Sequence, residues 1–390
     1  LAAGRGSCDG RAAAVNCAPT PRAKGADRGR ERMGEGGATG WRAALPGRVA
    51  AHATGAVGGF LAVQAGAPLP WLLGGMVGAA VLAAARPQGV GGPWVPSAIL
   101  RTTFVVVIGV MIGGAFTPEL ISSAAAWWPS LLGLIVFTLA AQLTVDALYR
   151  RHGMDRATAW FGAAPGGLIE SILLGEAAGG DVRRITVLQF GRIAAAVTLV
   201  PVLYSLWVGH AVGSAAGASY GHAAPLTPSD VAILVASGAV GWWGAKLLRI
   251  PAGAVVGPVI ASAAVHGFGW TAGQVPAWLV ALAQLVVGVG LGLRFAGPKP
   301  REMAGSLGLS AASVLIMLAM ALGVALVAAP WSMEGPSVLL LSYAPGGIIE
   351  MGLIALSLGA NPVFVTAHHV VRVIFTVTVT PAIFRRLVRG

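Results

Sequence analysis

The sequence predicts an all-α polytopic membrane protein made of two inverted repeats, each with about five transmembrane helices plus one re-entrant Pro-Gly-Gly hairpin. Three observations lead to this fold class. Of the 390 residues, 56% are hydrophobic and only 10% are charged, which is too apolar for a soluble domain. Long apolar runs occupy most of the chain after residue 48. The tract at Ala163 to Glu170 recurs at Tyr343 to Glu350, 180 residues later.

The N-terminal segment 1–40 is predicted to be a disordered basic tail, because it carries seven of the 26 basic residues and no apolar periodicity. Met33 shortly precedes the first apolar run. We therefore interpret residues 1–32 as upstream sequence that is not translated, the alternative being a genuine cytoplasmic basic tail. Cys8 and Cys17 both fall here, so neither a disulfide nor a thiolate metal site is expected in the core.

The apolar runs form two sets of six, which indicates an internal duplication of the sequence. The first set is 49–66, 69–85, 98–116, 124–148, 157–179 and 185–209. The second set is 229–248, 251–268, 276–295, 306–328, 337–359 and 363–384. Spaced glycines recur at matching positions of the two sets: Gly109, Gly113, Gly288 and Gly292. The predicted divisions are membrane repeat 1 (41–210), an external linker (211–228) and membrane repeat 2 (229–390).

The basic residues that flank these runs decide between two topologies. If all twelve runs crossed the membrane, seven flanking basic residues would lie outside against ten inside, contrary to the positive-inside rule. If both Pro-Gly-Gly runs turn back, all seventeen lie inside, with both termini cytoplasmic. Each half then has an odd number of crossings, so the second half is inverted. The alternative is a kinked helix that spans the membrane fully.

Proline lacks a backbone donor and glycine lacks a side chain, so each tract should end one helix and leave peptide groups unpaired within the membrane. Such backbone is tolerated only where protein buries it or a wet cavity receives it. The half-helices that follow would aim positive N-terminal ends at the site, which suits an anion. The candidate substrate-binding or ion-binding residues recur in both halves: Pro165, Gly166, Gly167, Glu170, Gln189, Arg192, Pro345, Gly346, Gly347, Glu350, His369 and Arg372.

Two interpretations of the acids Glu170 and Glu350 remain open. Paired with Arg192 and Arg372, they would be structural ion pairs. With a pKa raised by burial, they would carry protons in a coupled cycle. A third outcome is that they do neither.

Neighbouring polar residues are also duplicated. Gln189 and His369 each stand three residues before the arginine of their half, so each shares its helix face. His369 is interpreted as a packing residue more readily than as a titrating group. Asp181 and Asn361 are expected to cap the last helix of each half. Asp146 is expected to pair at the interface with a nearby arginine.

Enzyme chemistry finds little support in the sequence. The adjacent His368 and His369 point to different helix faces, and no carboxylate stands four residues from either, so no metal site is expected. No nucleophile elbow, Walker loop or dinucleotide fingerprint occurs. We therefore expect neither an enzyme nor a cofactor, and no nucleic-acid partner.

The two Ala-Pro-Gly-Gly tracts, the Leu-Leu-Gly element near Trp71 and the six-run duplication resemble the AbrB family of bacterial integral membrane proteins over about residues 45–385. Members are often labelled ammonia monooxygenase, and the family has links to gene regulation. The sequence contains no visible copper ligand set, and nothing in it resembles the small soluble DNA-binding regulator that shares the family's name.

The expected function is that of a secondary transporter for a small organic anion or metabolite, coupled to protons or another cation. The resemblance implies a bacterial cytoplasmic (inner) membrane, so the partners are the lipid bilayer and a small-molecule or ion substrate. A homodimer is a candidate assembly, because transporters with crossed hairpins often dimerise. The alternative is a membrane-embedded ligand sensor or regulator of gene expression. An ammonia monooxygenase-type oxidoreductase subunit is less favoured.

Overall fold

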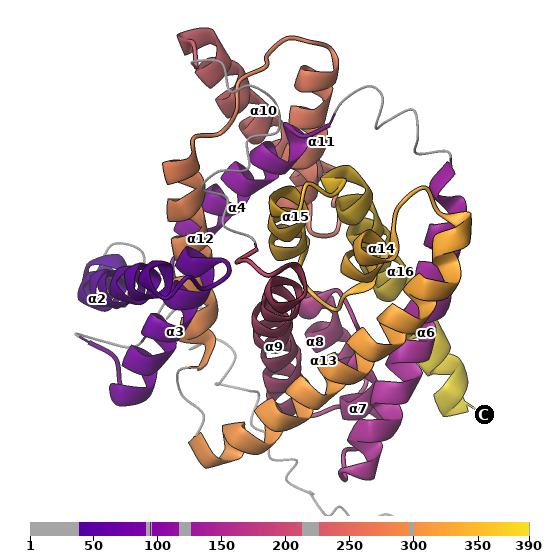
Figure 1. The fold of residues 1–390 in the computed structure, drawn as a ribbon. Coiled ribbons are helices and arrows are strands. Elements are labelled where there is room, and N and C mark those ends of the chain that lie inside the picture. The colour runs from indigo at the N-terminus through magenta and orange to yellow at the C-terminus, as the bar shows by residue number, and fades with distance from the viewer. Residues whose placement is uncertain are drawn as a thin grey trace, which may run out of the picture.

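The computed structural model describes residues 39–90, 94, 96–116, 126–212, 226–295 and 300–389, and all the regular elements in this part of the chain are helices (Figure 1). The predicted basic tail lies almost wholly outside the described residues, as does most of the predicted linker. The helices of the first half are α2 (Thr39–Gln64), α3 (Pro70–Ala85), α4 (Ala98–Gly113), α6 (Trp128–Arg151), α7 (Arg156–Ala163), α8 (Leu168–Ala177) and α9 (Val182–Val208). Those of the second half are α10 (Pro228–Leu247), α11 (Gly253–Gly267), α12 (Ala277–Gly292), η2 (Leu293–Phe295), α13 (Pro300–Ala328), η3 (Ala329–Trp331), α14 (Pro336–Tyr343), α15 (Ile348–Ser357) and α16 (Pro362–Arg389).

The second half repeats the helix order of the first. Helices α7 and α14 each have 8 residues, α8 and α15 each have 10, and α9 and α16 have 27 and 28. A rare backbone feature recurs as well. Leu69 before α3 and Ala252 before α11 are both non-glycine residues with positive φ, at 44° and 53°. The two halves therefore share the order and the approximate lengths of their last three helices, as well as this backbone feature.

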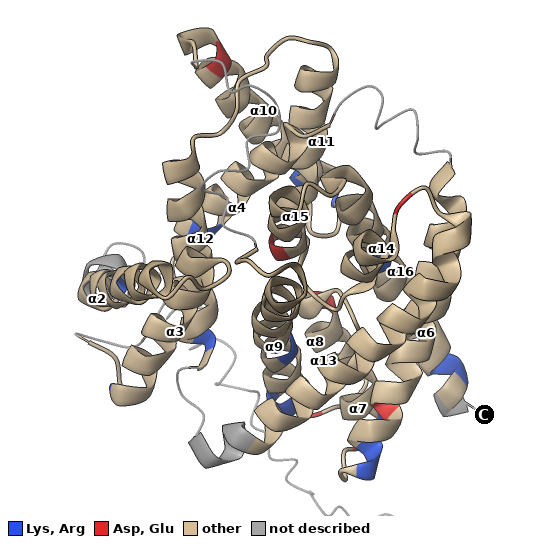
Figure 2. Cartoon of the chain, viewed as in Figure 1, with Lys and Arg blue, Asp and Glu red and all other residues tan. Residues whose placement is uncertain are grey.

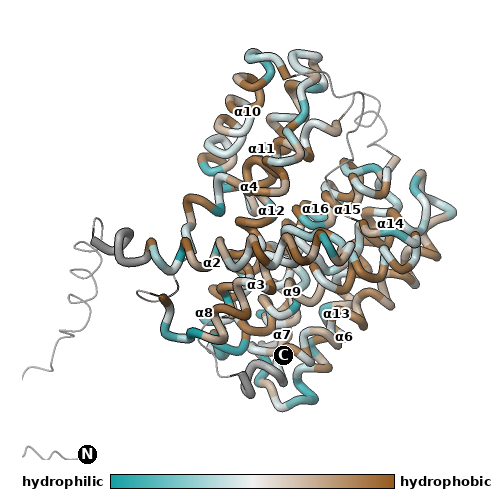
Figure 3. The backbone as a smooth tube through the Cα atoms, turned by 60° about the vertical axis from the view of Figure 1, so that its left-hand side comes forward, coloured by the Kyte–Doolittle hydropathy of each residue, from teal (hydrophilic) through white to brown (hydrophobic). Residues whose placement is uncertain are grey.

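Helix length and composition indicate a membrane protein. Among the described residues, five helical segments are long and apolar enough to cross a membrane: 128–151, 182–208, 277–295, 305–331 and 362–387. Charged residues are sparse along the helices (Figure 2), and apolar stretches dominate most of them (Figure 3). The all-α membrane class is confirmed at this level.

The helices pack as two bundles (Figure 1). The outer bundle contains α2, α3, α4, α10, α11 and α12. The broken-helix bundle contains α6, α7, α8, α9, α13, α14, α15 and α16. Each half of the chain thus supplies its first three long helices to the outer bundle and the remainder to the other.

The halves contact each other reciprocally through glycines. On α12, a Cβ at Gly288 would collide with the carbonyl oxygen of Leu72 on α3. In the matching contact, a Cβ at Gly109 on α4 would come within 2.9 Å of the carbonyl oxygen of Val255 on α11. Small residues allow membrane helices to approach this closely. The spaced glycines of the two sets therefore form close contacts between helices of the two halves.

The two bundles meet where α15 lies against α4. A Cβ at Gly352 would come within 2.8 Å of Cδ1 of Ile112, and both helices contribute to the largest cluster of buried apolar residues. This contact brings the second broken segment against the outer bundle.

Candidate functional site: two broken helix pairs

Both Pro-Gly-Gly tracts interrupt a helix, as predicted. Helix α7 ends at Ala163 and α8 begins at Leu168, while α14 ends at Tyr343 and α15 begins at Ile348. The two breaks differ in detail, because Gly167 has a left-handed φ of 64°. At the equivalent position in the second half, φ is −82°.

Each broken pair starts and ends at the same place in the structure. At the first pair, the backbone N–H of Asp181 donates to Oγ1 of Thr158 at 2.7 Å, which joins the first turn of α7 to the residue directly before α9. At the second, Nδ2 of Asn361 donates to Oε1 of Glu334 at 2.9 Å across the equivalent interval. Asp181 and Asn361 also cap the helices that follow them, as expected. In both pairs, the start of the first short helix is therefore linked to the segment that follows the second short helix.

The first break is held by a buried arginine and glutamine from α9. Arg192 donates through Nη1 to the carbonyl oxygen of Ala164, and through Nη2 to Oε1 of Gln189 at 2.7 Å. Nε2 of Gln189 in turn donates to the carbonyl oxygen of Phe161 at 2.7 Å. The last carbonyl groups of a helix lack intrahelical partners. These two side chains supply the missing donors for α7, and the predicted shared face of Gln189 and Arg192 is confirmed.

The second break repeats this arrangement from α16. Arg372 donates to the carbonyl oxygen of Ala344 through Nη1 and to that of Gly346 through Nη2, the latter at 2.6 Å. Nε2 of His369 donates to the carbonyl oxygen of Leu341 at 3.2 Å. His369 thus occupies the place of the glutamine in the first half. This contact matches the packing interpretation of His369.

The two glutamates lie against the glycines that precede their own helices. A Cβ at Gly347 would collide with Oε2 of Glu350, and a Cβ at Gly167 would lie 3.4 Å from Oε2 of Glu170. Both acids stand in the first turn, where unpaired N–H groups and the positive end of the helix dipole favour an anion. The carboxylates of Glu170 and Glu350 therefore serve as the anions at the N-terminal ends of α8 and α15.

The interpretation as direct glutamate–arginine ion pairs is corrected by these contacts. In the described part of the chain, neither glutamate is within ion-pair distance of Arg192 or Arg372. Each arginine instead compensates the negative C-terminal end of the first short helix, while the glutamate compensates the positive N-terminal end of the second. At each break, the arginine therefore binds the end of the helix before it and the glutamate lies at the start of the helix after it, without direct contact between the two charges.

The two halves differ in how far the site is exposed. Glu350 is only 5% exposed, whereas Glu170 is half-buried. Pro165 and Pro345 are buried. The accessible surface at the breaks belongs to the glycines Gly166, Gly167, Gly346 and Gly347, which are all half-exposed. Backbone at both breaks is therefore open to a solute or to water.

Two further arginines near this region were not identified from the sequence. Arg101 of α4 is exposed, and its charge interacts with that of Glu350 across the contact between the bundles. The exposed guanidinium group of Arg294 lies 5.0 Å from the ring centroid of Phe190 on α9. From the sequence both count as charges that flank apolar runs, because only the tertiary packing brings Arg101 near the second break and Arg294 against α9. The Nε atoms of the two break arginines are buried without a hydrogen-bond partner.

Other candidate residues have structural partners. Asp146 pairs with Arg150 at 2.9 Å, as expected. Nε2 of His368 shares a hydrogen bond of 2.9 Å with Oγ of Ser130 on α6. Within the described ranges, no three His, Cys, Asp or Glu side chains gather as a metal ion would require.

A family model described as transition state regulatory protein AbrB matches residues 71–388, most of the chain. The chain belongs to the AbrB family. This AbrB-family protein is 28% identical over 364 residues to an uncharacterised Bacillus subtilis (strain 168) protein called YhjN, a match that covers 86% of this chain and 91% of the relative. It is 26% identical over 345 residues to a candidate regulator called AbrB from Escherichia coli (strain K12), covering 84% of this chain and 92% of the relative. The family resemblance seen in the sequence is confirmed.

Proposed function

We propose that this AbrB-family protein is a secondary transporter that moves a small organic anion across the bacterial cytoplasmic membrane, coupled to protons or another cation. The observation that carries the proposal is the pair of broken helices, each with half-exposed glycine backbone in a chain of apolar helices. Non-helical backbone at membrane depth belongs to solute pathways in transporters. The proposed protein is not an enzyme and uses no cofactor.

The lengths of the short helices support two re-entrant hairpins. Helices of 8 and 10 residues measure about 12 and 15 Å. Each is about half of a hydrocarbon layer of about 30 Å. Because each pair starts and ends at one place, both tips would lie near the middle of the membrane. The reciprocal contacts of α3 with α12 and of α4 with α11 support two repeats related by a twofold axis, as in inverted-repeat transporters.

The charges around the second break support an anionic substrate. The glutamates are already engaged at the ends of their own helices, so they do not neutralise the arginines directly. Arg101 and Arg294 are exposed beside this region, where either could contact a carboxylate or phosphate group. Their excess positive charge favours an anion over a cation.

Glu350 is the proposed proton carrier. It is buried, it lies at the contact between the bundles, and an exposed cation, Arg101, influences it from the opposite bundle. A carboxyl group in this position would gain or lose its proton as the broken-helix bundle moves against the outer bundle. Glu170 is half-exposed and stands in the first turn of α8, so it is assigned a capping role only.

Transport by purified protein in liposomes tests the proposal. Uptake of a panel of small radiolabelled carboxylates is measured under an imposed proton or sodium gradient, with protein-free liposomes as the blank. We expect at least one anion to accumulate, and Arg101→Ala to reduce its uptake at least tenfold. Arg184→Ala, which removes an exposed arginine at the start of α9, is the matched control. Absence of flux for every anion under both gradients, with monodisperse protein, would overturn the proposal.

A membrane-embedded ligand sensor or regulator is the second candidate, favoured by the name of the Escherichia coli relative. A sensor would bind a small anion at the same breaks and change its contacts with a partner protein without releasing the anion across the membrane. Saturable anion binding without flux, together with a ligand-dependent partner, would favour this function over transport.

A further inference from the structure

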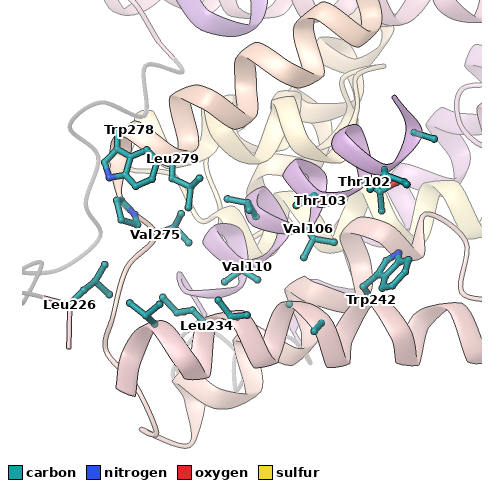
Figure 4. A pocket seen from close by; sticks show the side chains of 18 residues that line it. Thr102, Thr103, Val106, Val110, Leu226, Leu234, Trp242, Val275, Trp278 and Leu279 are labelled. Carbon is teal, nitrogen blue, oxygen red and sulfur yellow. The ribbon is translucent and has the colours of Figure 1, made fainter. Parts of the chain in front are cut away.

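A long apolar groove runs along the outer bundle, away from the broken helices. It has a volume of about 780 Å³ and lies between α4, α10 and the start of α12 (Figure 4). No charged side chain lines it, and the hydroxyl groups of Thr102 and Thr103 are nearly its only polar features. A charged substrate has no partner in such a groove.

The geometry points to a binding site for one phospholipid of the surrounding bilayer, with an acyl chain in this groove and its phosphate beside Lys246. The groove follows α10 from Val231 to Trp242, which is about 16 Å of helix. That length matches one leaflet, which is half of a hydrocarbon layer of about 30 Å. A single extended acyl chain therefore fills it along its whole length.

One end of the groove carries the side chains that a lipid headgroup requires. Trp242 lies at this end (Figure 4), and tryptophan is enriched at membrane–water interfaces. Nζ of the exposed Lys246 lies 5.6 Å from the ring centroid of Trp242. A lysine one turn beyond an apolar groove is well placed for the phosphate of an anionic headgroup.

A second copy of the chain fits the groove less well. A twofold dimer contact uses the same patch on both subunits. Two copies facing each other here would set groove against groove and leave the space unfilled. An acyl chain from the bilayer fills it without a second protein.

Native mass spectrometry of protein released from nanodiscs made of equal parts of phosphatidylglycerol and phosphatidylethanolamine tests this site. Val235 lines the groove, whereas Val240 lies on the same helix outside it, and the two are 66% and 64% exposed. We expect wild-type protein and Val240→Trp to retain one phospholipid per chain, and Val235→Trp to lose it. Ala239→Phe, also in the groove, repeats the test if Val235→Trp does not fold.

The headgroup is tested by Lys246→Gln. This variant should keep the bound lipid and lose about fivefold in preference for phosphatidylglycerol, because one basic residue near an anionic headgroup contributes about that much. Equal lipid retention by Val235→Trp and Val240→Trp would overturn the proposal. It would also be overturned if Val235→Trp alone converted a dimer to monomers, which would make the occupant a second copy.

Discussion

Arg372 donates a hydrogen bond to the carbonyl oxygen of Ala344, which is the residue directly before the second Pro-Gly-Gly tract. The equivalent contact in the first half repeats it 180 residues earlier along the chain. At each helix break, a buried arginine thus donates to a backbone carbonyl oxygen that has no hydrogen-bond partner within its own helix.

Arg372→Ala should lower the free energy of unfolding by about 2 kcal/mol, because the buried carbonyl oxygen of Ala344 then has lost its donor and that of Gly346 also loses a hydrogen bond. The melting temperature of detergent-purified protein measures the loss. Arg184→Ala is the surface control and should change stability by less than about 0.5 kcal/mol. Equal melting temperatures for the two variants would contradict the assignment.

The equivalent glycines Gly167 and Gly347 should prove necessary for different reasons. Gly167→Ala should cost at least about 1–2 kcal/mol, because φ at this position is left-handed and the new Cβ would also lie 2.6 Å from Cγ2 of Val377. Gly347→Ala should be destabilising because its Cβ displaces the carboxylate of Glu350. Adding Glu350→Ala should therefore relieve much of the damage at Gly347, whereas adding Glu170→Ala should leave the cost at Gly167. Double-mutant cycles on melting temperature separate these cases, and similar coupling in both halves would contradict the prediction.

Contact between the two halves should depend on Gly288. Gly288→Ala should destabilise the protein by about 1–3 kcal/mol, because the new methyl group meets the carbonyl oxygen of Leu72. Gly323→Ala on α13 is the opposite case, since no atom lies within 4 Å of its Cβ position, and it should stabilise by about 0.5–1 kcal/mol. Thermal unfolding of both variants shows whether each substitution lowers or raises stability. A change in the same direction for both would contradict the packing role of Gly288.

Coupled transport should depend unequally on the two acids. Glu350→Gln should remove the response of anion uptake to a proton gradient, because Glu350 is the buried carboxyl at the contact between the bundles. Glu170→Gln should keep that response and lose only some stability. Uptake with and without a proton gradient in liposomes distinguishes the two variants. A matching loss of coupling in Glu170→Gln would show that the half-exposed acid also carries protons.

Glu334, in the connection before α14, should make stability depend on pH. Burial raises the pKa of its carboxyl group, and the hydrogen bond from Asn361 opposes this in part. A raised pKa in the folded state means that stability is greatest at low pH and falls as pH rises through the folded-state pKa, starting from about 4.5. Glu334→Gln should therefore reduce the fall of the melting temperature as pH rises above about 4.5, while Asn361 keeps an acceptor in the glutamine side chain. An unchanged pH profile would contradict this.

The sequence predicts the duplication, the helix breaks and the helix caps because each has a local signal. Two breakers in a row end a helix wherever they occur, and Asp181 and Asn361 stand where a cap is needed. The partners of the arginines could not be predicted in the same way. Every residue carries a carbonyl oxygen, so no sequence pattern marks Ala164 or Ala344 as an acceptor, whereas a nearby glutamate suggests an ion pair at once.

The proximity of Arg101 to Glu350 was equally hidden, because nearly 250 residues separate them in the sequence. The division of each half between two bundles was hidden too. Apolar periodicity reports that a helix is buried, and glycine spacing reports that it packs closely, but neither names the neighbouring helix. Helix α3 of the first half packs against α12 of the second, and α11 of the second packs against α4 of the first. Only contacts in the folded structure, such as that of Gly288 with Leu72, reveal these pairings.

The packing of α3 and α4 against helices of the second half limits how the chain can fold during synthesis. When synthesis has passed residue 212, α2, α3 and α4 are complete, yet α10, α11 and α12, which pack against α3 and α4, do not exist. Neither bundle can close until the second half has been made. The first half must wait with its glycine-lined faces unmatched, so truncation anywhere before α12 should leave no native bundle at all.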